Sequence, residues 1–156
     1  MIQINIPEVG ILNLAYLILD YNGTIATDGF VSPSVREKLN VLSKDLEIYV
    51  VTADTNGNAT ENLAGLPLTL LRFPTGPAAK EKLRVLKQFG ENKCIFIGNG
   101  LNDMHAASKA ALSIGIIGNE GMYSKLLLNT DIIFNDINDA LGSLLKTNRI
   151  VADLRG

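Results

Sequence analysis

The sequence predicts an α/β fold in which a mostly parallel sheet carries helices on both faces. Short apolar runs typical of buried strands alternate along the chain with segments of helical periodicity, and this alternation is typical of parallel sheets. The 156 residues comprise 47% hydrophobic and 19% charged residues, a composition that supports a full core and argues against disorder. This length fits one domain, so we expect a single domain over residues 1–156.

Two strands are expected before the first helix. Isoleucines alternate with polar residues over 2–6, which is the pattern of a short strand. Residues 7–10 indicate a turn, and the apolar run over 11–19 indicates a second, more buried strand. Asp28-Gly29 is a tight-turn signal, so a small hairpin is expected around it.

Apolar runs mark the later strands, and apolar residues at helical spacing mark the helices. Ser32 and Pro33 are typical of a helix start, and Gly90 is typical of a helix end. The later strands are expected at 46–51, 68–71, 94–97, 113–117 and 131–134. The helices are expected at 32–42, 56–63, 78–89, 103–111, 123–128 and 137–145. This order predicts a three-layer, Rossmann-like architecture.

The charges argue against a general nucleic-acid binder. The net charge is −2, whereas such a protein needs a basic face. Basic residues do cluster at Lys80, Lys82, Arg84 and Lys87, but acidic residues flank them. A solvated helix face is therefore the favoured interpretation of this cluster.

Cys94 is the only cysteine, so no disulfide can form within the chain, which fits a reducing compartment. It lies in an apolar stretch, where a buried and inert thiol is expected. The apolar segments are shorter than the roughly 20 residues that a membrane helix needs. The N-terminus also lacks the basic start and cleavage site of a signal peptide. We therefore expect a cytoplasmic protein without a membrane partner.

Polar residues follow three of the predicted strands at the point where each strand ends. Asp20 closes the apolar run over 14–19 and precedes a turn that contains glycine, a position that is a poor choice for a purely structural carboxylate. Thr52 and Asp54 follow the next strand of the sheet, and residues 98–103 (GNGLND) follow a third. Because open α/β folds build their sites at the carboxyl edge of the sheet, we expect these groups to converge there.

Together these side chains match the chemistry of phosphoryl transfer. Asp20 can attack phosphorus and form an acyl phosphate. The hydroxyl of Thr52 and the ammonium of Lys80, at the start of a helix, can hold the phosphate oxygens. Asp20 and Asp103 can hold Mg²⁺, a hard ion that keeps several waters and needs few carboxylates.

Each of these residues also has a structural interpretation. Asp20 can cap a turn, Thr52 can be an ordinary strand end, and Lys80 can be an ordinary surface residue. Asp103 can cap the helix that follows it, and His105, the sole histidine, is favoured as a surface or satisfied residue over a catalytic one. The order and shared topology of the set favour the catalytic interpretation.

At these positions the chain resembles the haloacid-dehalogenase-like (HAD) superfamily, and within it the phosphorylation domain of P-type ATPases and their soluble relatives. The resemblance covers about residues 14–145. Four motifs carry it in order: Asp20-Tyr21-Asn22-Gly23-Thr24, Thr52-Ala53-Asp54, Pro77-Ala78-Ala79-Lys80 and the loop from Gly98 to Asp103.

The resemblance implies a HAD-like fold and assigns a role to each motif residue. It makes Asp20 the nucleophile and gives phosphate binding to Thr52 and Lys80. The implied Mg²⁺ ligands are Asp20, the backbone carbonyl of Asn22, Asn99 and Asp103.

Two positions depart from the family pattern. Superfamily phosphatases have a second aspartate, which shuttles protons, where this chain has Asn22, and an amide cannot do so. The resemblance therefore implies slow turnover, about 10²–10⁴-fold below an aspartate form. Asn99 stands where the family usually has a metal-binding aspartate, so a lower affinity for Mg²⁺ is expected.

The motifs lie close together in the sequence. The spans from Asp20 to Thr52 and from Thr52 to Lys80 leave no room for a cap domain or for the nucleotide-binding domain of the ATPases. Without membrane helices, ion pumping is excluded. Capless members of the superfamily often oligomerise, which makes a homo-oligomer plausible.

The leading hypothesis is a Mg²⁺-dependent phosphatase that acts on a phosphorylated small molecule or macromolecule through an aspartyl phosphate. The alternative is a catalytically impaired, phosphate-responsive module that binds a partner, which Asn22 and Asn99 favour. A third hypothesis is a phosphotransferase, because a long-lived acyl phosphate can pass its group to an acceptor other than water.

Overall fold

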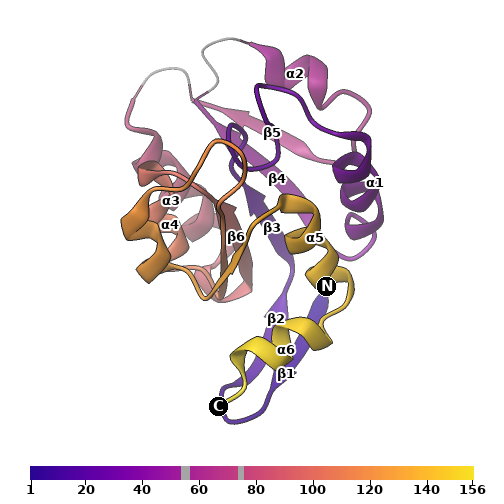
Figure 1. Ribbon diagram of the computed structural model, residues 1–156, viewed down its shortest axis with the longest axis vertical. Coiled ribbons are helices and arrows are strands. Elements are labelled where there is room, and N and C mark those ends of the chain that lie inside the picture. Colours follow the sequence, from indigo (N-terminus) through magenta and orange to yellow (C-terminus); the bar gives the residue numbers. More distant parts are fainter. Residues whose placement is uncertain (54–56, 74–75) are drawn as a thin grey trace.

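The computed structural model describes residues 1–53, 57–73 and 76–156 and confirms the α/β fold (Figure 1). The strands are β1 (Ile2–Ile6), β2 (Gly10–Leu14), β3 (Tyr16–Leu19), β4 (Glu47–Thr52), β5 (Thr69–Arg72), β6 (Cys94–Gly98), β7 (Leu112–Ile116) and β8 (Ile132–Phe134). The α-helices are α1 (Pro33–Leu42), α2 (Asn58–Asn62), α3 (Ala78–Phe89), α4 (Met104–Ala107), α5 (Ile137–Leu145) and α6 (Asn148–Leu154). Short 3₁₀ helices are η1 (Glu91–Lys93), η2 (Leu101–Asp103) and η3 (Ser124–Asn129).

A parallel sheet of six strands, in the order β5-β4-β3-β6-β7-β8, forms the centre of the molecule. β3 pairs with β4 on one side and β6 on the other, so that Leu19 lies opposite both Val50 and Ile97. The carboxyl ends of these three strands therefore lie side by side. The predicted convergence of the motifs depends on this register.

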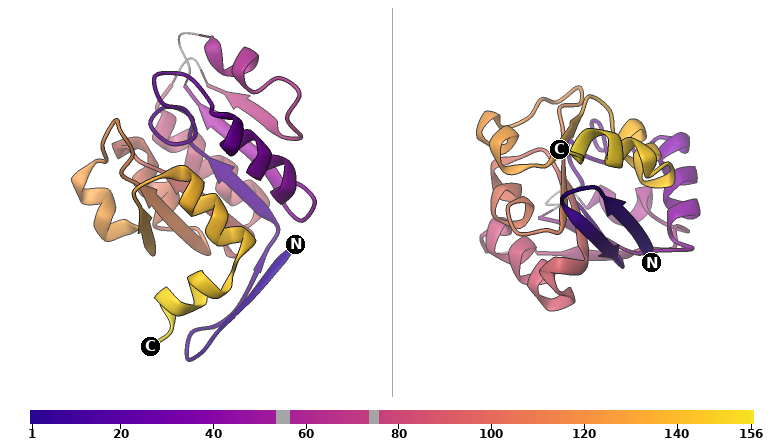
Figure 2. Two further views of the ribbon diagram at one scale, coloured as in Figure 1. Left: turned by 45° about the vertical axis from the view of Figure 1, so that its right-hand side comes forward. Right: turned by 90° about the horizontal axis from the view of Figure 1, so that it is seen from below.

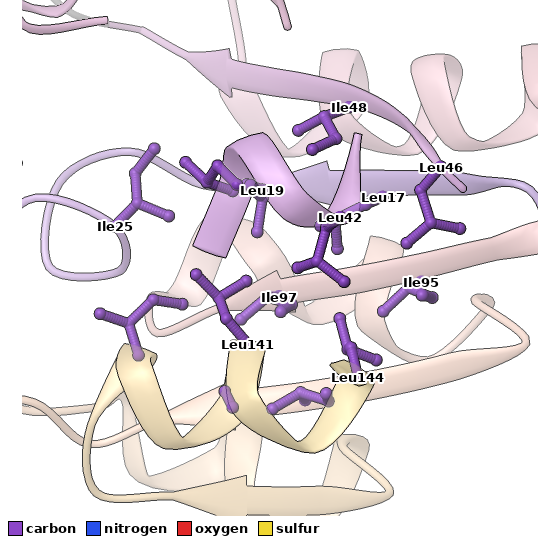
Figure 3. Packing of buried hydrophobic residues seen from close by; sticks show 14 of the residues in the cluster. Leu17, Leu19, Ile25, Leu42, Leu46, Ile48, Ile95, Ile97, Leu141 and Leu144 are labelled. Atoms are coloured by element: carbon purple, nitrogen blue, oxygen red, sulfur yellow. The ribbon is translucent and has the colours of Figure 1, made fainter. Parts of the chain in front are cut away.

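Helices cover both faces of the sheet, as predicted. Helices α1 and α5 pack on one face, where Leu42 and Leu141 meet Leu17 of β3 in the larger core cluster (Figure 3). Helices α3 and α4 pack on the other face against Ile18 and Phe96. Because successive strand residues point to opposite faces, the unbroken apolar sequence of β3 is explained by its burial on both sides.

No cap domain is inserted between the motifs in the described residues. Between β3 and β4 the chain forms a loop and α1, and between β4 and α3 it forms α2 and β5. None of the helices in this described part has the length and apolar character needed to cross a bilayer.

The single strand predicted over 11–19 is in fact two strands. The chain leaves its antiparallel pairing with β1 at Leu14 and enters the parallel sheet at Tyr16. Ala15 marks the change, because its N–H donates to Lys93 O at 2.9 Å and its carbonyl accepts from Glu47 N at 3.0 Å. The β1–β2 hairpin therefore lies at the amino end of β3, projecting from the main body beside α6 (Figure 2).

Other predicted elements differ in length or type. The helix predicted over 103–111 is the 3₁₀ helix η2 followed by the single turn of α4, and the helix predicted over 123–128 is the 3₁₀ helix η3. Helix α6 was not predicted. Ile150 is its buried residue, and Val151 and Leu154 pack partly buried against the larger core cluster. The helix has only seven residues, which is too short a stretch for a helical period to be recognised.

Candidate active site

A cavity of ≈ 700 Å³ opens at the carboxyl ends of β3, β4 and β6. Its lining includes Asp20 after β3, Thr52 at the end of β4 and Asn99 after β6. Three motifs that are far apart in the sequence thus meet in one place. Asp54, from the second motif, lies outside the described residues.

Asp20 is held at the cavity floor by the backbone of the neighbouring strand. Its N–H donates to Ile97 O at 2.9 Å, so it continues the pairing of β3 with β6. The residue is 8% exposed. Its Oδ2 accepts a long hydrogen bond of 3.4 Å from the hydroxyl of Thr24, which leaves Oδ2 the less engaged carboxylate oxygen.

The loop after Asp20 needs glycine at Gly23. Gly23 has φ +73°, and a Cβ there would lie 2.3 Å from Asn99 Nδ2, so only glycine fits this close approach. The loop is anchored further on by the Tyr21 hydroxyl, which donates to Gly29 O at 2.9 Å. The turn predicted at Asp28-Gly29 is present, with both residues at positive φ.

Lys82, not Lys80, is the cation beside Asp20. Its ammonium lies 2.6 Å from Asp20 Oδ1 and 2.5 Å from Asp103 Oδ1, and the residue is 1% exposed. It also donates to Asn102 Oδ1 at 3.2 Å. Lys80 is exposed, which corrects both the role predicted for Lys80 and the solvated face predicted for Lys82.

Asp103 is fully buried and joins the cation to the loop that follows β6. Its Oδ2 accepts hydrogen bonds from the backbone N–H groups of Asn99 at 3.0 Å and Gly100 at 2.8 Å, while Oδ1 faces Lys82. A Cβ on Gly98 would lie 2.5 Å from Asp103 Cγ. The glycine therefore makes room for the carboxylate to turn back over its own loop.

The charges of Asp20, Lys82 and Asp103 lie close together, and they change the pKa values of Asp20 and Lys82. Burial, supported by the nearby charge of Asp103, raises the pKa of Asp20 to about 6, although Lys82 opposes this. Burial alone would lower the pKa of Lys82, but the two carboxylates outweigh it and raise the pKa above its ordinary value. Lys82 is therefore a permanent cation, whereas Asp20 is a carboxylate that ionises close to neutral pH.

Asn99 connects the loop that follows Asp20 to the segment before η3. Its Nδ2 donates to Gly121 O at 3.0 Å, and its Oδ1 accepts from the Thr24 hydroxyl at 3.2 Å. Because a carbonyl oxygen can only accept, the amide nitrogen has to face Gly121. An aspartate in this position has no proton to donate to that carbonyl.

Two other residues singled out in the sequence line the cavity. Asn22 is exposed. Its side-chain amide does not ionise at neutral pH, so it cannot act as a general acid or base. His105 is exposed on α4 and also lines the cavity, so the surface position expected for it is at the edge of the site. Cys94, by contrast, is buried away from it as predicted, and burial raises the pKa of its thiol to about 11.

The donor set suits a hard ion better than a transition metal. Within residues 1–53, 57–73 and 76–156, no group of three or more His, Cys, Asp or Glu side chains could hold a metal ion. Two carboxylates, Asp20 and Asp103, do converge with amide oxygens nearby. Mg²⁺ binds through one or two carboxylates and retains water, so Asp20, which lines the cavity, fits it directly, whereas both oxygens of the buried Asp103 already accept hydrogen bonds.

Three residues of the site were not predicted as functional: Lys82, Asn102 and Thr24. Lys82 occupies the buried face of α3 together with Val85 and Leu86. A lysine among apolar residues at helical spacing was the available signal. The hydrogen bonds of Asn102 and Thr24 depend on contacts across the fold, which the sequence does not display.

No family model matches the sequence. Two curated proteins of Methanocaldococcus jannaschii do match it. The uncharacterized protein MJ0073 is 45% identical over 78 residues, which cover 47% of this chain and 84% of that protein. The uncharacterized protein MJ0072 is 50% identical over 40 residues, which cover 26% of this chain and 91% of that protein.

Solved structures with the same fold include phosphatases and a putative HAD family hydrolase of Streptomyces avermitilis, which matches with a TM-score of 0.69 at 13% identity, over 86% of this chain and 84% of that one. The cobalt-bound deoxy-D-mannose-octulosonate 8-phosphate phosphatase of Haemophilus influenzae matches with a TM-score of 0.73 at 14% identity, over 92% of this chain and 94% of that one. The corresponding Moraxella catarrhalis enzyme, solved with magnesium, phosphate and KDO, matches with a TM-score of 0.68 at 14% identity, over 92% and 95%. These matches establish the HAD-like fold.

Proposed function

Since this chain belongs to the same family as the archaeal proteins MJ0073 and MJ0072 and has the HAD-like fold, we propose that it is a Mg²⁺-dependent phosphatase acting through an aspartyl phosphate. The observation that carries the proposal is Asp20 at the floor of an open cavity, paired with the buried ammonium of Lys82. The solved structures with this fold, one of which holds magnesium and phosphate, support the same activity. We assign all catalytic groups to one core domain over residues 1–156, without a cap.

Each group at the cavity floor has a distinct task. An oxygen of Asp20 attacks phosphorus, the bond from phosphorus to the leaving oxygen breaks, and an acyl phosphate forms. The hydroxyl of Thr52, which lines the cavity, can donate to the phosphate oxygens. Lys82, in place of the predicted Lys80, adds a positive charge beneath the floor, where it is held by Asp20 and Asp103. Water then attacks phosphorus, which releases inorganic phosphate and restores Asp20.

The proposed Mg²⁺ ligands are the predicted ones: Asp20, the backbone carbonyl of Asn22, Asn99 and Asp103. Bound Mg²⁺ supplies charge stabilisation at the phosphoryl oxygens. Asn99 joins this set through the second lone pair of an oxygen that already accepts from Thr24. Asp103 contributes mainly by fixing Lys82 and the loop, because both of its oxygens already accept hydrogen bonds.

Asn22 makes the proposed enzyme slow. Neither the leaving oxygen nor the attacking water has an aspartate at this position to exchange protons with, so water has to serve. General acid–base catalysis typically accelerates a reaction by about 10²–10⁴-fold. We therefore expect Asn22→Asp to raise the turnover rate by a factor of this order. A slow second step would also be shared with the phosphorylation domain of P-type ATPases, which the four sequence motifs resemble.

The test is hydrolysis of p-nitrophenyl phosphate, with and without EDTA, by the wild type and three variants. We expect Mg²⁺-dependent turnover in the wild type, a large gain in Asn22→Asp and none in Asp20→Ala. Asp153→Ala, which changes an exposed residue on α6, serves as the control and should match the wild type. Activity that survives Asp20→Ala contradicts the mechanism.

A phosphate-responsive binding module is the second candidate, because two amides replace acids in this site and Asn99 has a structural contact of its own. This candidate predicts no turnover in the wild type, in Asn22→Asp or in the double variant Asn22→Asp/Asn99→Asp. A phosphotransferase is distinguished by release of p-nitrophenol that exceeds release of inorganic phosphate when an acceptor alcohol is added. Homo-oligomer formation and a cytoplasmic location stay predictions from the sequence, and sedimentation velocity tests the first.

A further inference from the structure

The cavity has a polar floor and an apolar wall. The floor carries Asp20, Asn22, Thr52 and Asn99. Most of the wall is formed by Ala53, Pro77, Ala78, Ala79, Leu101 and Met104, and Gly100, Asn102 and His105 complete the lining. A phosphoryl group bound at Asp20 would leave its leaving group facing this wall, because both belong to the same cavity.

Leu101 is an unusual part of the wall. It is 61% exposed, and it belongs to neither of the two core clusters. Burial in the core therefore does not explain a leucine at this position, next to the polar loop that carries Asn99. Its side chain offers apolar surface to whatever enters the cavity.

Apart from the proposed Mg²⁺ and the imidazole of His105, the described lining of the cavity offers no cation to a charged leaving group. No Lys or Arg is among the described residues that line it, and Lys82 lies beneath the floor, held between Asp20 and Asp103. The sequence of 54–56 and 74–75 contains no Lys or Arg either. A carboxylate on the leaving group would lose hydration here without gaining a lysine or arginine partner.

The cavity is larger than a phosphate group needs. At ≈ 700 Å³ it lies well within the range of roughly 300–1,000 Å³ that is usual for small-molecule sites with mainly apolar linings. Most of this space is therefore available to the leaving group.

On the premise of the proposed function, we infer that the substrate is a phosphate monoester whose leaving group is uncharged and apolar beside the ester oxygen, as in an aryl phosphate. Leu101 is the specificity-determining contact. This separates the chain from the fold neighbours named above, one of which was solved with the sugar acid KDO.

The test measures binding of three phosphonates, which cannot be hydrolysed, by calorimetry in the presence of Mg²⁺. Benzylphosphonate carries an apolar ring, methylphosphonate carries almost nothing, and phosphonoacetate carries a carboxylate. We expect benzylphosphonate to bind on the order of tenfold more tightly than methylphosphonate, since burying one face of a ring contributes about that much. Phosphonoacetate should bind no better than methylphosphonate.

Leu101→Ser should remove most of the preference for benzylphosphonate and leave the affinity for methylphosphonate unchanged. Leu128→Ser is the matched control, because Leu128 is 91% exposed and does not line this cavity. Equal affinities of the wild type for benzylphosphonate and methylphosphonate, or tighter binding of phosphonoacetate, overturn the inference. If this occurs while p-nitrophenyl phosphate is still hydrolysed, only the inference fails. If no phosphonate binds and no ester is hydrolysed, the proposed function fails with it.

Discussion

Asp20, Lys82 and Asp103 form a buried cluster with one positive charge between two carboxylates. Asp20 forms part of the cavity floor, whereas Lys82 and Asp103 lie beneath it, almost completely shielded from solvent. The charges of Asp20 and Asp103 are tolerated in this position only while the ammonium lies between them. Lys82 therefore supports both the stability of the fold and the ionisation of the proposed nucleophile.

Replacing Lys82 by methionine should remove activity and destabilise the protein. Loss of one partner from a buried ion pair costs about 3–5 kcal/mol, and here two carboxylates are left facing each other. Urea denaturation at pH 7 and the p-nitrophenyl phosphate assay measure both effects. Lys80→Met is the control, because Lys80 is exposed, and a larger effect of Lys80→Met than of Lys82→Met would contradict this assignment.

The reason for assigning the wrong lysine lies in helix geometry. One residue of an α-helix turns the chain by about 100°, so Lys80 and Lys82 point to nearly opposite sides of α3. The motif spacing alone placed a lysine near the start of the helix. The buried positions Val85 and Leu86 show which side faces the site, and this requires knowledge of how the helix packs.

Asn99→Asp should lower the free energy of unfolding of the metal-free protein and raise its affinity for Mg²⁺. The carboxylate cannot donate to the carbonyl of Gly121, which leaves that contact repulsive and costs about 1–3 kcal/mol. The added charge favours the cation. Urea denaturation in EDTA should show the loss, and titration with Mg²⁺ should recover it in the variant more than in the wild type.

Asn129→Asp is the control for that experiment, because the Asn129 side chain also donates to a backbone carbonyl, that of Lys125, but at an exposed position. Its effect should be less than about 0.5 kcal/mol. A metal-free Asn99→Asp protein that is at least as stable as the wild type would show that the contact with Gly121 contributes nothing.

At the scale of single elements, the turn from β6 into η2 shapes the site. Gly98 and Gly115 are register partners at the carboxyl ends of adjacent strands. A Cβ on Gly98 would lie 2.5 Å from the Asp103 carboxyl carbon, whereas a Cβ on Gly115 would lie 2.3 Å from the terminal methyl of Met122. Methionine can move its methyl at low cost, but Asp103 is fixed by its bonds to the backbone and to Lys82.

Gly98→Ala should therefore be more damaging than Gly115→Ala. Displacing Asp103 is expected to lower activity by about 10²-fold, the usual effect of misplacing a catalytic group by about 1 Å. Gly115→Ala should cost about 1 kcal/mol of stability and little activity. Steady-state kinetics on both variants at a temperature where each is folded makes the comparison, and equal activities would show that this turn does not position Asp103.

Element boundaries could be predicted where local chemistry defines them. Pro77 and Gly90 delimit α3, and its predicted range of 78–89 is confirmed. The Ser32 cap, whose side chain accepts from Val35 N, starts α1 as expected. The change of partner at Ala15 and helix α6 could not be predicted, because both depend on which strand or core surface lies alongside.

At the scale of the whole molecule, parallel pairing of β3 with β4 and β6 brings the motifs that follow these strands to the same edge of the sheet. The fold class could be predicted because alternation of strands and helices leaves few topologies. The parallel fold class in turn predicts that the ends of β3, β4 and β6 lie at one edge of the sheet. The buried charges beneath that edge were hidden, since a sequence shows charge but not the depth at which the charge lies.

These buried charges should make the stability of the metal-free protein depend on pH in an unusual sense. The pKa of Asp20 is about 6 in the folded protein against its ordinary 3.8, so the folded state binds the proton more tightly than the unfolded state. The stabilising contribution is full below pH 4 and is lost as the pH rises through 6, and it amounts to about 3 kcal/mol. The groups that face Asp20 are Lys82 from α3 and Asp103 from η2, and Lys82 stays charged throughout this range.

Because other carboxylates also titrate, the relevant quantity is the difference in free energy of unfolding between Asp20→Asn and the wild type. This difference should increase in favour of Asp20→Asn by about 2.4 kcal/mol between pH 4 and pH 7, measured by urea denaturation in EDTA. Added Mg²⁺ should reduce it, since the cation favours the ionised carboxylate of the wild type. A difference that is constant over this range would mean that Asp20 has the pKa of an exposed aspartate, and that neither its burial nor the charge of Asp103 raises this pKa as described above.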